Sequence, residues 1–314
     1  MDAPKSSDPT STPETTSLPV APERLRLIRR IEPVPFAIIT LALVFFLYQA
    51  VGGGITLLLF KGAITEDNVQ LVRWATLVGQ IVFILIPTLI LMRLRAPRVI
   101  EFARLKVPDY KEILLTAVAV FALQQVLQGY MLLQDAIPVP AGLERILDQI
   151  KDLIEQTYLV LVTAHTPLEL LFVVVVVALV PAVSEELLFR GLIQRSFEQV
   201  VVGPRGAIIT GIIFAAFHLI PYSVVPLAIL GCYLGYIVYR SQNITVAISA
   251  HFFNNFVACV AAYLQVEDNF VALAPSGTAS PALLVANYLL FGVVFLAATY
   301  YFVQVTEPTV RSES

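Results

Sequence analysis

The chain has 314 residues, of which 58% are apolar and only 14% are charged, with a mean hydropathy of +0.81. These values lie far outside those of an ordinary soluble domain and indicate a polytopic membrane protein, with membrane lipids as its surroundings. The net charge of −3 and the short, scattered basic clusters exclude nucleic acid as a partner. No polar stretch is long enough for a second domain, so we expect one bundle.

The two ends of the chain are predicted to be tails. Residues 1–30 are assigned to a disordered cytoplasmic N-terminal tail, because their first 22 residues are rich in Ser, Thr and Pro and have no apolar run. They also lack the basic start and apolar core of a signal peptide. Residues 31–306 are assigned to the transmembrane bundle, and residues 307–314 to a C-terminal tail.

Eight apolar stretches are long enough, or nearly so, to cross ~30 Å of hydrocarbon. The fifth and sixth are short and are separated only by IPYSVV, so they predict a tight helical hairpin. The predicted fold is an all-α membrane bundle of about eight transmembrane helices. The stretches are 35–60, 74–92, 113–133, 168–189, 207–221, 225–239, 244–264 and 282–302.

An additional helix is predicted between the third and fourth stretches. Apolar residues recur at helical spacing from Leu143 to Ile154, whereas Arg145, Lys151 and Asp152 lie off that face. Such an amphipathic helix either lies in the membrane interface or folds back on the bundle, and the pattern favours neither.

The distribution of Lys and Arg predicts the orientation in the membrane, because cytoplasmic loops carry the excess of positive charge. With both termini in the cytoplasm, all but four of the 20 basic residues fall in cytoplasmic segments. The four exceptions are Lys61, Arg73, Arg145 and Lys151. We therefore expect an integral protein of the inner or plasma membrane, if the source is bacterial.

Two adjacent acids and two histidines lie inside predicted spans. Glu185 and Glu186 end the run LLFVVVVVALVPAVSEE, His218 lies in GIIFAAFHLIP, and His251 lies in VAISAHFFNNF. An acid within a membrane costs a few kcal/mol unless it is paired or functional. At ~1.5 Å per residue, the two histidines and Glu185 lie roughly 12 to 20 Å from the predicted cytoplasmic ends of their spans. Three separate helices thus place ionisable groups at similar depth.

The chemistry open to this cluster is narrow. A carboxylate can act as general base toward water, and imidazoles can share that water or stabilise an oxyanion. Glu185, His218 and His251 would also suit one divalent metal ion such as zinc. No phosphate-binding glycine loop and no cysteine pair at redox spacing occurs, so hydrolysis is the favoured reaction.

The motifs resemble those of the CPBP intramembrane proteases, the group that contains the type II CAAX prenyl endopeptidases and the bacteriocin-processing or immunity proteins. The resemblance covers about 168–264 and rests on three motifs in order. They are Glu185-Glu186-x-x-x-Arg190, Phe214-x-x-x-His218 and His251-x-x-x-Asn255.

The resemblance implies an eight-helix bundle whose site opens toward the cytoplasm, where a peptide bond of a membrane-associated or lipidated substrate is hydrolysed. Glu185 would activate water with His218, and His251 and Asn255 would hold the oxyanion or complete a metal site. Asn255 is preferred to its neighbour Asn254 because it shares a helix face with His251. Both a metalloprotease and a metal-free glutamate mechanism stay open.

Supporting roles go to three further residues. Glu186 and Arg190, four residues apart, are predicted to form a buried ion pair, and Phe214 completes the second motif. Two other functions compete with proteolysis: an ion or solute transporter, since intramembrane acids and histidines also build relays, and a catalytically inactive scaffold or immunity protein. Oligomeric state and substrate are not predicted.

Overall fold

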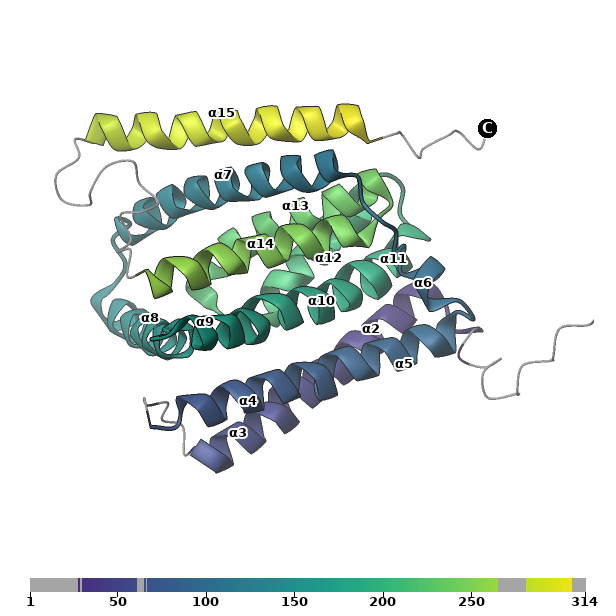
Figure 1. Ribbon diagram of the computed structural model, residues 1–314, viewed down its shortest axis with the longest axis horizontal. Helices are drawn as coiled ribbons and strands as arrows, with labels where there is room; N and C mark the ends of the chain where they lie inside the picture. Colours follow the sequence, from purple (N-terminus) through teal and green to yellow (C-terminus); the bar gives the residue numbers. More distant parts are fainter. Residues whose placement is uncertain (1–27, 29, 61–64, 66, 265–280, 307–314) are drawn as a thin grey trace, which may run out of the picture.

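The computed structural model describes residues 28, 30–60, 65, 67–264 and 281–306, and within them it contains helices and no strand (Figure 1). The all-α expectation is therefore confirmed. The two predicted tails lie outside the described residues, apart from Ile28 and Arg30.

Among the described residues, seven helical segments are long and apolar enough to cross a membrane. Several contain π-helical turns, labelled η. The first segment comprises α2 (Pro33–Phe45), η1 (Phe46–Gly52) and α3 (Gly53–Phe60), the second α4 (Val69–Gly79), η2 (Gln80–Leu85) and α5 (Ile86–Arg95), and the third α7 (Tyr110–Asp135). The fourth comprises α9 (Pro167–Val173), η3 (Val174–Leu179), α10 (Val180–Glu186), η4 (Leu187–Gln194) and α11 (Arg195–Glu198). The last three segments contain α13 (Val224–Ser241), α14 (Ile244–Tyr263) and α15 (Pro281–Val305), respectively.

The fifth predicted span, 207–221, is wrong as a full crossing. Its helix, α12 (Arg205–Phe217), has 13 residues, and at ~1.5 Å per residue it is about 20 Å long, short of the ~30 Å core. The helix ends because Leu219 adopts a left-handed conformation, with φ of 56°, and Pro221 follows. His218 is consequently the residue that caps a short helix, rather than a residue inside a long one.

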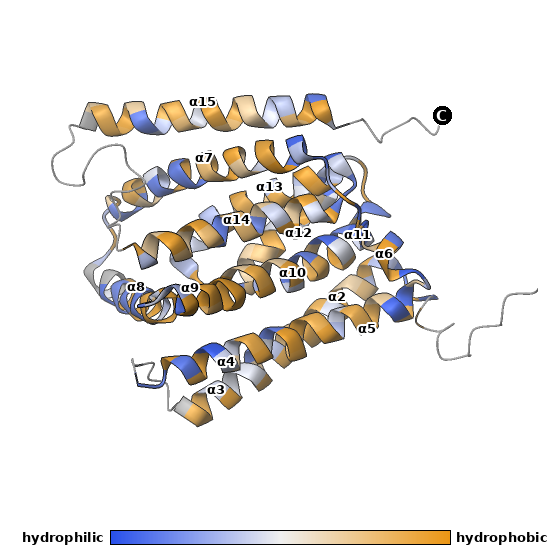
Figure 2. Ribbon diagram, viewed as in Figure 1, coloured by the Kyte–Doolittle hydropathy of each residue, from blue (hydrophilic) through white to orange (hydrophobic). Residues whose placement is uncertain are grey.

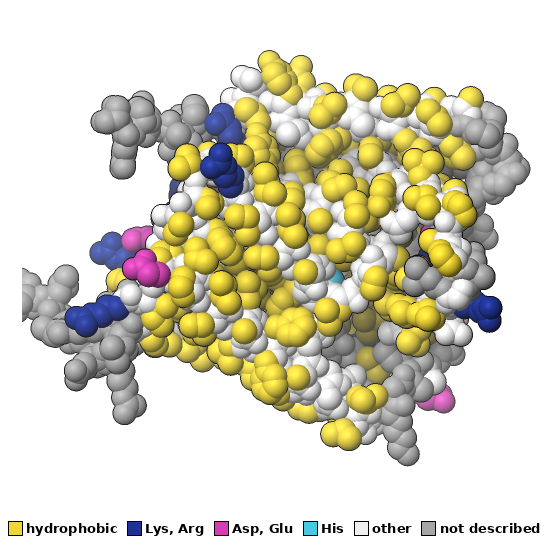
Figure 3. Space-filling view, turned by 180° about the vertical axis from the view of Figure 1, so that it is seen from behind, with side chains coloured by type: hydrophobic (Ala, Val, Ile, Leu, Met, Phe, Trp, Pro, Cys, Tyr) yellow, Lys and Arg dark blue, Asp and Glu magenta, His cyan; other side chains and the backbone are white. Residues whose placement is uncertain are grey.

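The helices form three groups side by side (Figure 1). The helices α2 to α5 lie on one side, α7 and α15 lie on the other, and α9 to α14 lie between them. Orange, apolar residues dominate the long helices other than α8, and charged side chains gather at the two ends of the bundle (Figures 2 and 3). The central group contains every predicted site residue.

The predicted amphipathic helix is present as α8 (Ala141–Val162), and its contacts agree with the placement in which it folds back on the bundle. Ile146 and Leu153 remain exposed near its first half. Its last turns pack on α4 and α14, where the buried Arg73 donates to the carbonyl oxygen of Leu161 at 3.0 Å and pairs with Glu169. The C-terminal end of α8 thereby covers one end of the central group.

Two of the four basic residues that deviate from the predicted charge distribution are neutralised by acids. Arg73 contacts Glu169 at 2.5 Å, and Lys151 contacts Asp135 at 2.8 Å. A hydrogen bond from Lys151 to Asp135 raises the pKa of this lysine.

At the opposite, arginine-rich end, the buried Arg104 contacts Glu198 at 2.8 Å. Burial lowers the pKa of the Arg104 guanidinium.

Candidate active site

Four residues predicted to act together line a single pocket of about 250 Å³ in the central group: Glu185, His218, His251 and Asn255. They come from α10, the end of α12, and α14. Phe214 and Asn254 also line it. The spatial cluster that the motifs imply is therefore present, and the role of each residue stays a prediction.

Glu185 is the partly buried member of the acidic pair and faces the pocket. Its Oε1 accepts a hydrogen bond from Nε2 of Gln80 at 3.4 Å. The same Nε2 lies 3.3 Å from the hydroxyl of Tyr48, and Oε1 of Gln80 accepts from Ser184 at 2.8 Å. Because an ionised carboxylate only accepts hydrogen bonds, the amide of Gln80 must present its NH₂ to Glu185.

Glu186 does not line the pocket and is fully buried, as expected of the predicted ion pair. Its Oε1 contacts Nη1 of Arg190 at 2.8 Å and Nδ1 of His251 at 2.8 Å. The predicted Glu186–Arg190 pair is present, and the contact with His251 was not foreseen. A carboxylate that accepts from one ring nitrogen fixes the orientation of the imidazole. Glu186 thus positions a histidine of the pocket as well as its own helix.

Arg190 reaches across to α13 because two glycines let helices approach closely. Its Nη2 donates to the carbonyl oxygen of Gly231 at 2.9 Å. A Cβ on Gly231 would lie 2.8 Å from the carbonyl oxygen of Gly211, and a Cβ on Gly211 would collide with the backbone of Cys232. The guanidinium carbon also lies 4.7 Å from the ring centre of Phe214. Arg190 therefore joins α10, α12 and α13.

His218 is held by its own helix. Its Nδ1 lies 2.7 Å from the carbonyl oxygen of Phe214, and since a carbonyl only accepts, the proton must be on Nδ1 and Nε2 is left as an acceptor. The ring stacks edge-on against Phe214, with centroids 4.5 Å apart. Phe214 also lies 6.1 Å from His251, so the aromatic residue of the second motif separates and supports both imidazoles.

Asn255 is anchored to η3 through the carbonyl group of Val177, which Pro181 leaves without its usual helical donor. Pro181 has no N–H, so the carbonyl of Val177 lacks its usual helical partner, and it accepts from Nδ2 of Asn255 at 3.0 Å. Asn254 donates to Oδ1 of Asn255 at 3.1 Å. A carboxamide has two N–H groups, so one of those on Asn255 is left for a ligand. The expected distinction between the two asparagines corresponds to a real difference in their contacts.

The pocket lies on the α8 side of Glu185. Its remaining walls include Thr76 of α4, Tyr158 and Leu161 of α8, and Val176 of η3. On the other side of Glu185 the side chains of η4, from Leu188 to Ile193, are fully buried. The opening expected at the arginine-rich end is therefore not seen in the part of the chain that the structure describes. Which end faces the cytoplasm remains a prediction from the charges.

The residues fit a metal ion poorly in this arrangement. Within the described ranges, no three His, Cys, Asp or Glu side chains are grouped closely enough to hold an ion. Nδ1 of both histidines is engaged, with Phe214 and with Glu186. The set Glu185, His218 and His251 shares a pocket without forming a ligand cluster.

Sequence reasoning missed three polar residues near Glu185: Tyr48, Gln80 and Ser184. Gln80 is 5% exposed and Ser184 is fully buried. Ser184 directly precedes the acidic pair in the sequence, so its position could have indicated it. Gln80 and Tyr48 lie in other spans, and only their position as polar residues within apolar runs could have indicated them.

The fold and the site together define an integral membrane protein with a polar pocket enclosed by its helices, and ionisable residues inside a membrane mark functional sites. Residues 167–257 match the family described as type II CAAX prenyl endopeptidase Rce1-like. The resemblance drawn from the three motifs is thereby confirmed over that segment, and this family is a protease family. No curated protein and no solved structure matches the chain.

Proposed function

We propose that this protein is an intramembrane endopeptidase that hydrolyses a peptide bond of a membrane-associated or lipidated protein or peptide. The observation that supports this best is the convergence of Glu185, His218, His251 and Asn255 on one pocket, inside a segment that matches a family of endopeptidases. CAAX-type processing and leader-peptide processing are both consistent with these groups.

The proposed mechanism begins with a water molecule between Glu185 and His218. The carboxylate of Glu185 takes a proton from the water while the oxygen attacks the peptide carbonyl, and Nε2 of His218 accepts a hydrogen bond from the same water. The free N–H of Asn255 donates to the oxyanion, and Nε2 of His251 also donates to it when the ring is protonated at both nitrogens. The proton on Glu185 then passes to the leaving nitrogen as the C–N bond breaks.

Glu186 has a supporting role in this mechanism. Because its carboxylate accepts from Nδ1 of His251, it orients the ring and stabilises any positive charge that develops on it, as the acid of a Ser-His-Asp triad does. Arg190 pairs with the same oxygen of Glu186 at 2.8 Å and so holds the carboxylate in place. In this proposal Glu185 is the general base, and Glu186 positions His251.

The test uses purified protein in phospholipid vesicles, with three fluorogenic substrates: a farnesylated C-terminal peptide, a leader peptide and an unmodified transmembrane peptide. Cleavage of at least one by the wild type, and of none by Glu185→Gln, would support the proposal. Solute flux in sealed vesicles without any peptide product would instead identify a transporter. A substrate-trapping pull-down with Glu185→Gln would then name the substrate.

Whether hydrolysis depends on a bound metal ion is tested separately. Metal analysis of the purified protein, combined with chelator treatment, separates the two hydrolytic mechanisms. Stoichiometric zinc whose removal abolishes cleavage would favour the metalloprotease, with Glu185, His218 and His251 moving together to bind it. Full activity in metal-free protein would favour the glutamate mechanism.

A further inference from the structure

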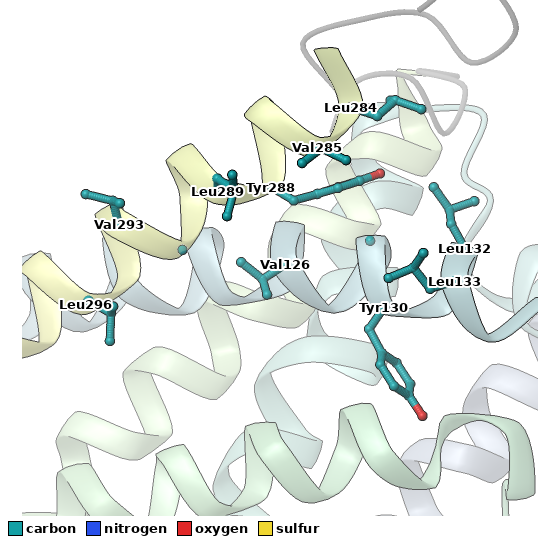
Figure 4. Close-up of a pocket in the computed structure, with 12 residues that line it drawn as sticks. Val126, Tyr130, Leu132, Leu133, Leu284, Val285, Tyr288, Leu289, Val293 and Leu296 are labelled. Carbon is teal, nitrogen blue, oxygen red and sulfur yellow. The ribbon is translucent and has the colours of Figure 1, made fainter. Parts of the chain in front are cut away.

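A long groove between α7 and α15 lies apart from the catalytic pocket (Figure 4). Its volume is about 690 Å³, within the range of sites that enclose a small molecule. Apart from Tyr130 and Tyr288, the side chains that line it are aliphatic, and none of the lining residues is shared with the pocket around Glu185. The aliphatic walls include Val126, Leu133, Leu284, Leu289, Val293 and Leu296.

Two glycines give the groove its shape. At Gly129 of α7 an added Cβ would lie 2.8 Å from the ring of Tyr288, so this glycine allows α7 and α15 to touch. At Gly292 of α15 an added Cβ would meet nothing within 4 Å, although Gly292 lines the groove. The two helices are therefore in close contact at one level and separated at another.

The length of the groove matches one leaflet of a bilayer. Along α15 it extends from Leu284 to Leu296, and 12 residues of helix rise about 18 Å, close to the ~15 Å depth of half the hydrocarbon core. It starts near the first residue of the apolar segment that begins at Ala282. The Tyr288 side chain points toward the end lined by Leu132 and Leu133 (Figure 4), and tyrosines are enriched at the interface.

We propose that this groove binds one acyl chain of a phospholipid, with the headgroup at the Leu284 end. The walls belong to two segments long and apolar enough to span a membrane, and Leu133 and Leu289 are 72% and 67% exposed on the outside of the bundle. An aliphatic chain fills such a groove without leaving a polar group unpaired. The absence of shared walls with the catalytic pocket favours a lipid of the bilayer over a substrate.

Gly292→Phe tests the proposal, because the new side chain would enter the groove without a clash in α15. The control is Gly53→Phe on α3, where an added Cβ also meets nothing within 4 Å. Each full-length variant is placed in phosphatidylcholine vesicles that contain a nitroxide-labelled phosphatidylcholine, and electron paramagnetic resonance counts the immobilised lipids. We expect Gly292→Phe to lose about one immobilised lipid per chain, and Gly53→Phe to lose none.

Gly292→Leu is a second variant with a smaller side chain, in case Gly292→Phe does not fold. We expect it to lose fewer immobilised lipids per chain than Gly292→Phe. Equal lipid counts for the wild type and both Gly292 variants would overturn the proposal. Displacement of the labelled lipid by stoichiometric farnesylated peptide would also overturn it, because the groove would then be a substrate site. The measurement involves no cleavage, so it succeeds or fails independently of the proposed function.

Discussion

The two faces of α10 show how differently adjacent carboxylates are used in one helix. On the pocket face, Glu185 is partly buried and has one long hydrogen bond, from Gln80 at 3.4 Å. On the core face, Glu186 is fully buried and its Oε1 has two contacts of 2.8 Å, with Arg190 and His251. A carboxylate that reacts with water must keep its oxygens available, whereas Oε1 of Glu186 is occupied by two partners and its buried Oε2 has no hydrogen-bond partner among the described residues.

The same contrast extends to the surroundings. The pocket face is lined by carboxamides and imidazoles from several helices, with space between them. The core face is filled by Phe189, whose ring meets the ring of the pocket-lining Phe214 edge-on, with centroids 5.1 Å apart. We therefore expect substitutions on the pocket face to reduce activity, and substitutions on the core face to reduce stability first.

The largest effect is expected for Glu185→Gln. Loss of the proposed general base should lower kcat by roughly 10⁴-fold, whereas the melting temperature should stay near that of the wild type, since the amide keeps the shape and the pocket remains open. Peptide cleavage and thermal unfolding in the same detergent measure the two quantities. The exposed Glu101→Gln is the matched control. A variant that cleaves at a wild-type rate would remove Glu185 from the mechanism.

The second effect should be on stability. Glu186→Ala leaves the fully buried Arg190 without its acidic partner, and breaking a buried pair in this way lowers the free energy of unfolding by about 3–5 kcal/mol. Denaturant titration in mixed micelles measures the loss. Glu101→Ala, at an exposed ion pair with Arg98, should change it by less than about 1 kcal/mol. If both variants lost the same small amount, the distinction between the two faces would fail.

A third prediction separates two neighbouring asparagines. Asn255→Ala removes the proposed oxyanion donor and should lower kcat by about 10²- to 10³-fold. Asn254→Ala removes only a side chain that donates to Asn255, and should lower kcat by less than about tenfold. Steady-state cleavage kinetics compare them. Equal losses would indicate that the asparagine pair acts through packing.

The smallest effect is expected for Gln80→Leu, which removes one hydrogen bond to Glu185 while keeping the size of the side chain. A hydrogen bond to a charged group contributes about 1.5–3 kcal/mol, and the long distance suggests the lower end, or roughly tenfold in kcat. Thr76→Val, on the same pocket wall, is the control. In a Glu185→Asp background the Gln80 effect should shrink, since the shorter carboxylate no longer meets the amide. An undiminished effect would show that Gln80 acts independently of Glu185.

Local patterns were sufficient to predict the spans and the motif residues. The apolar stretches around 35–60, 74–92, 113–133 and 244–264 coincide with long helices, because in a membrane the length of an apolar run determines whether a helix crosses. The 207–221 stretch failed because hydropathy does not report the backbone conformation of Leu219, which ends α12 early.

Contacts between distant residues were decided by the tertiary structure. The motif spacing i to i+4 placed Glu186 beside Arg190, since that spacing fixes neighbours on a helix. It carried no information about His251, 65 residues away, or about Gln80, 105 residues before Glu185. The sequence by itself determined a membrane bundle with ionisable groups at similar depth, because hydropathy and helical rise are local properties. Only the packing of α4, α10, α12 and α14 decided which carboxylate faces the pocket and which is buried, because orientation around a helix axis depends on what each face meets.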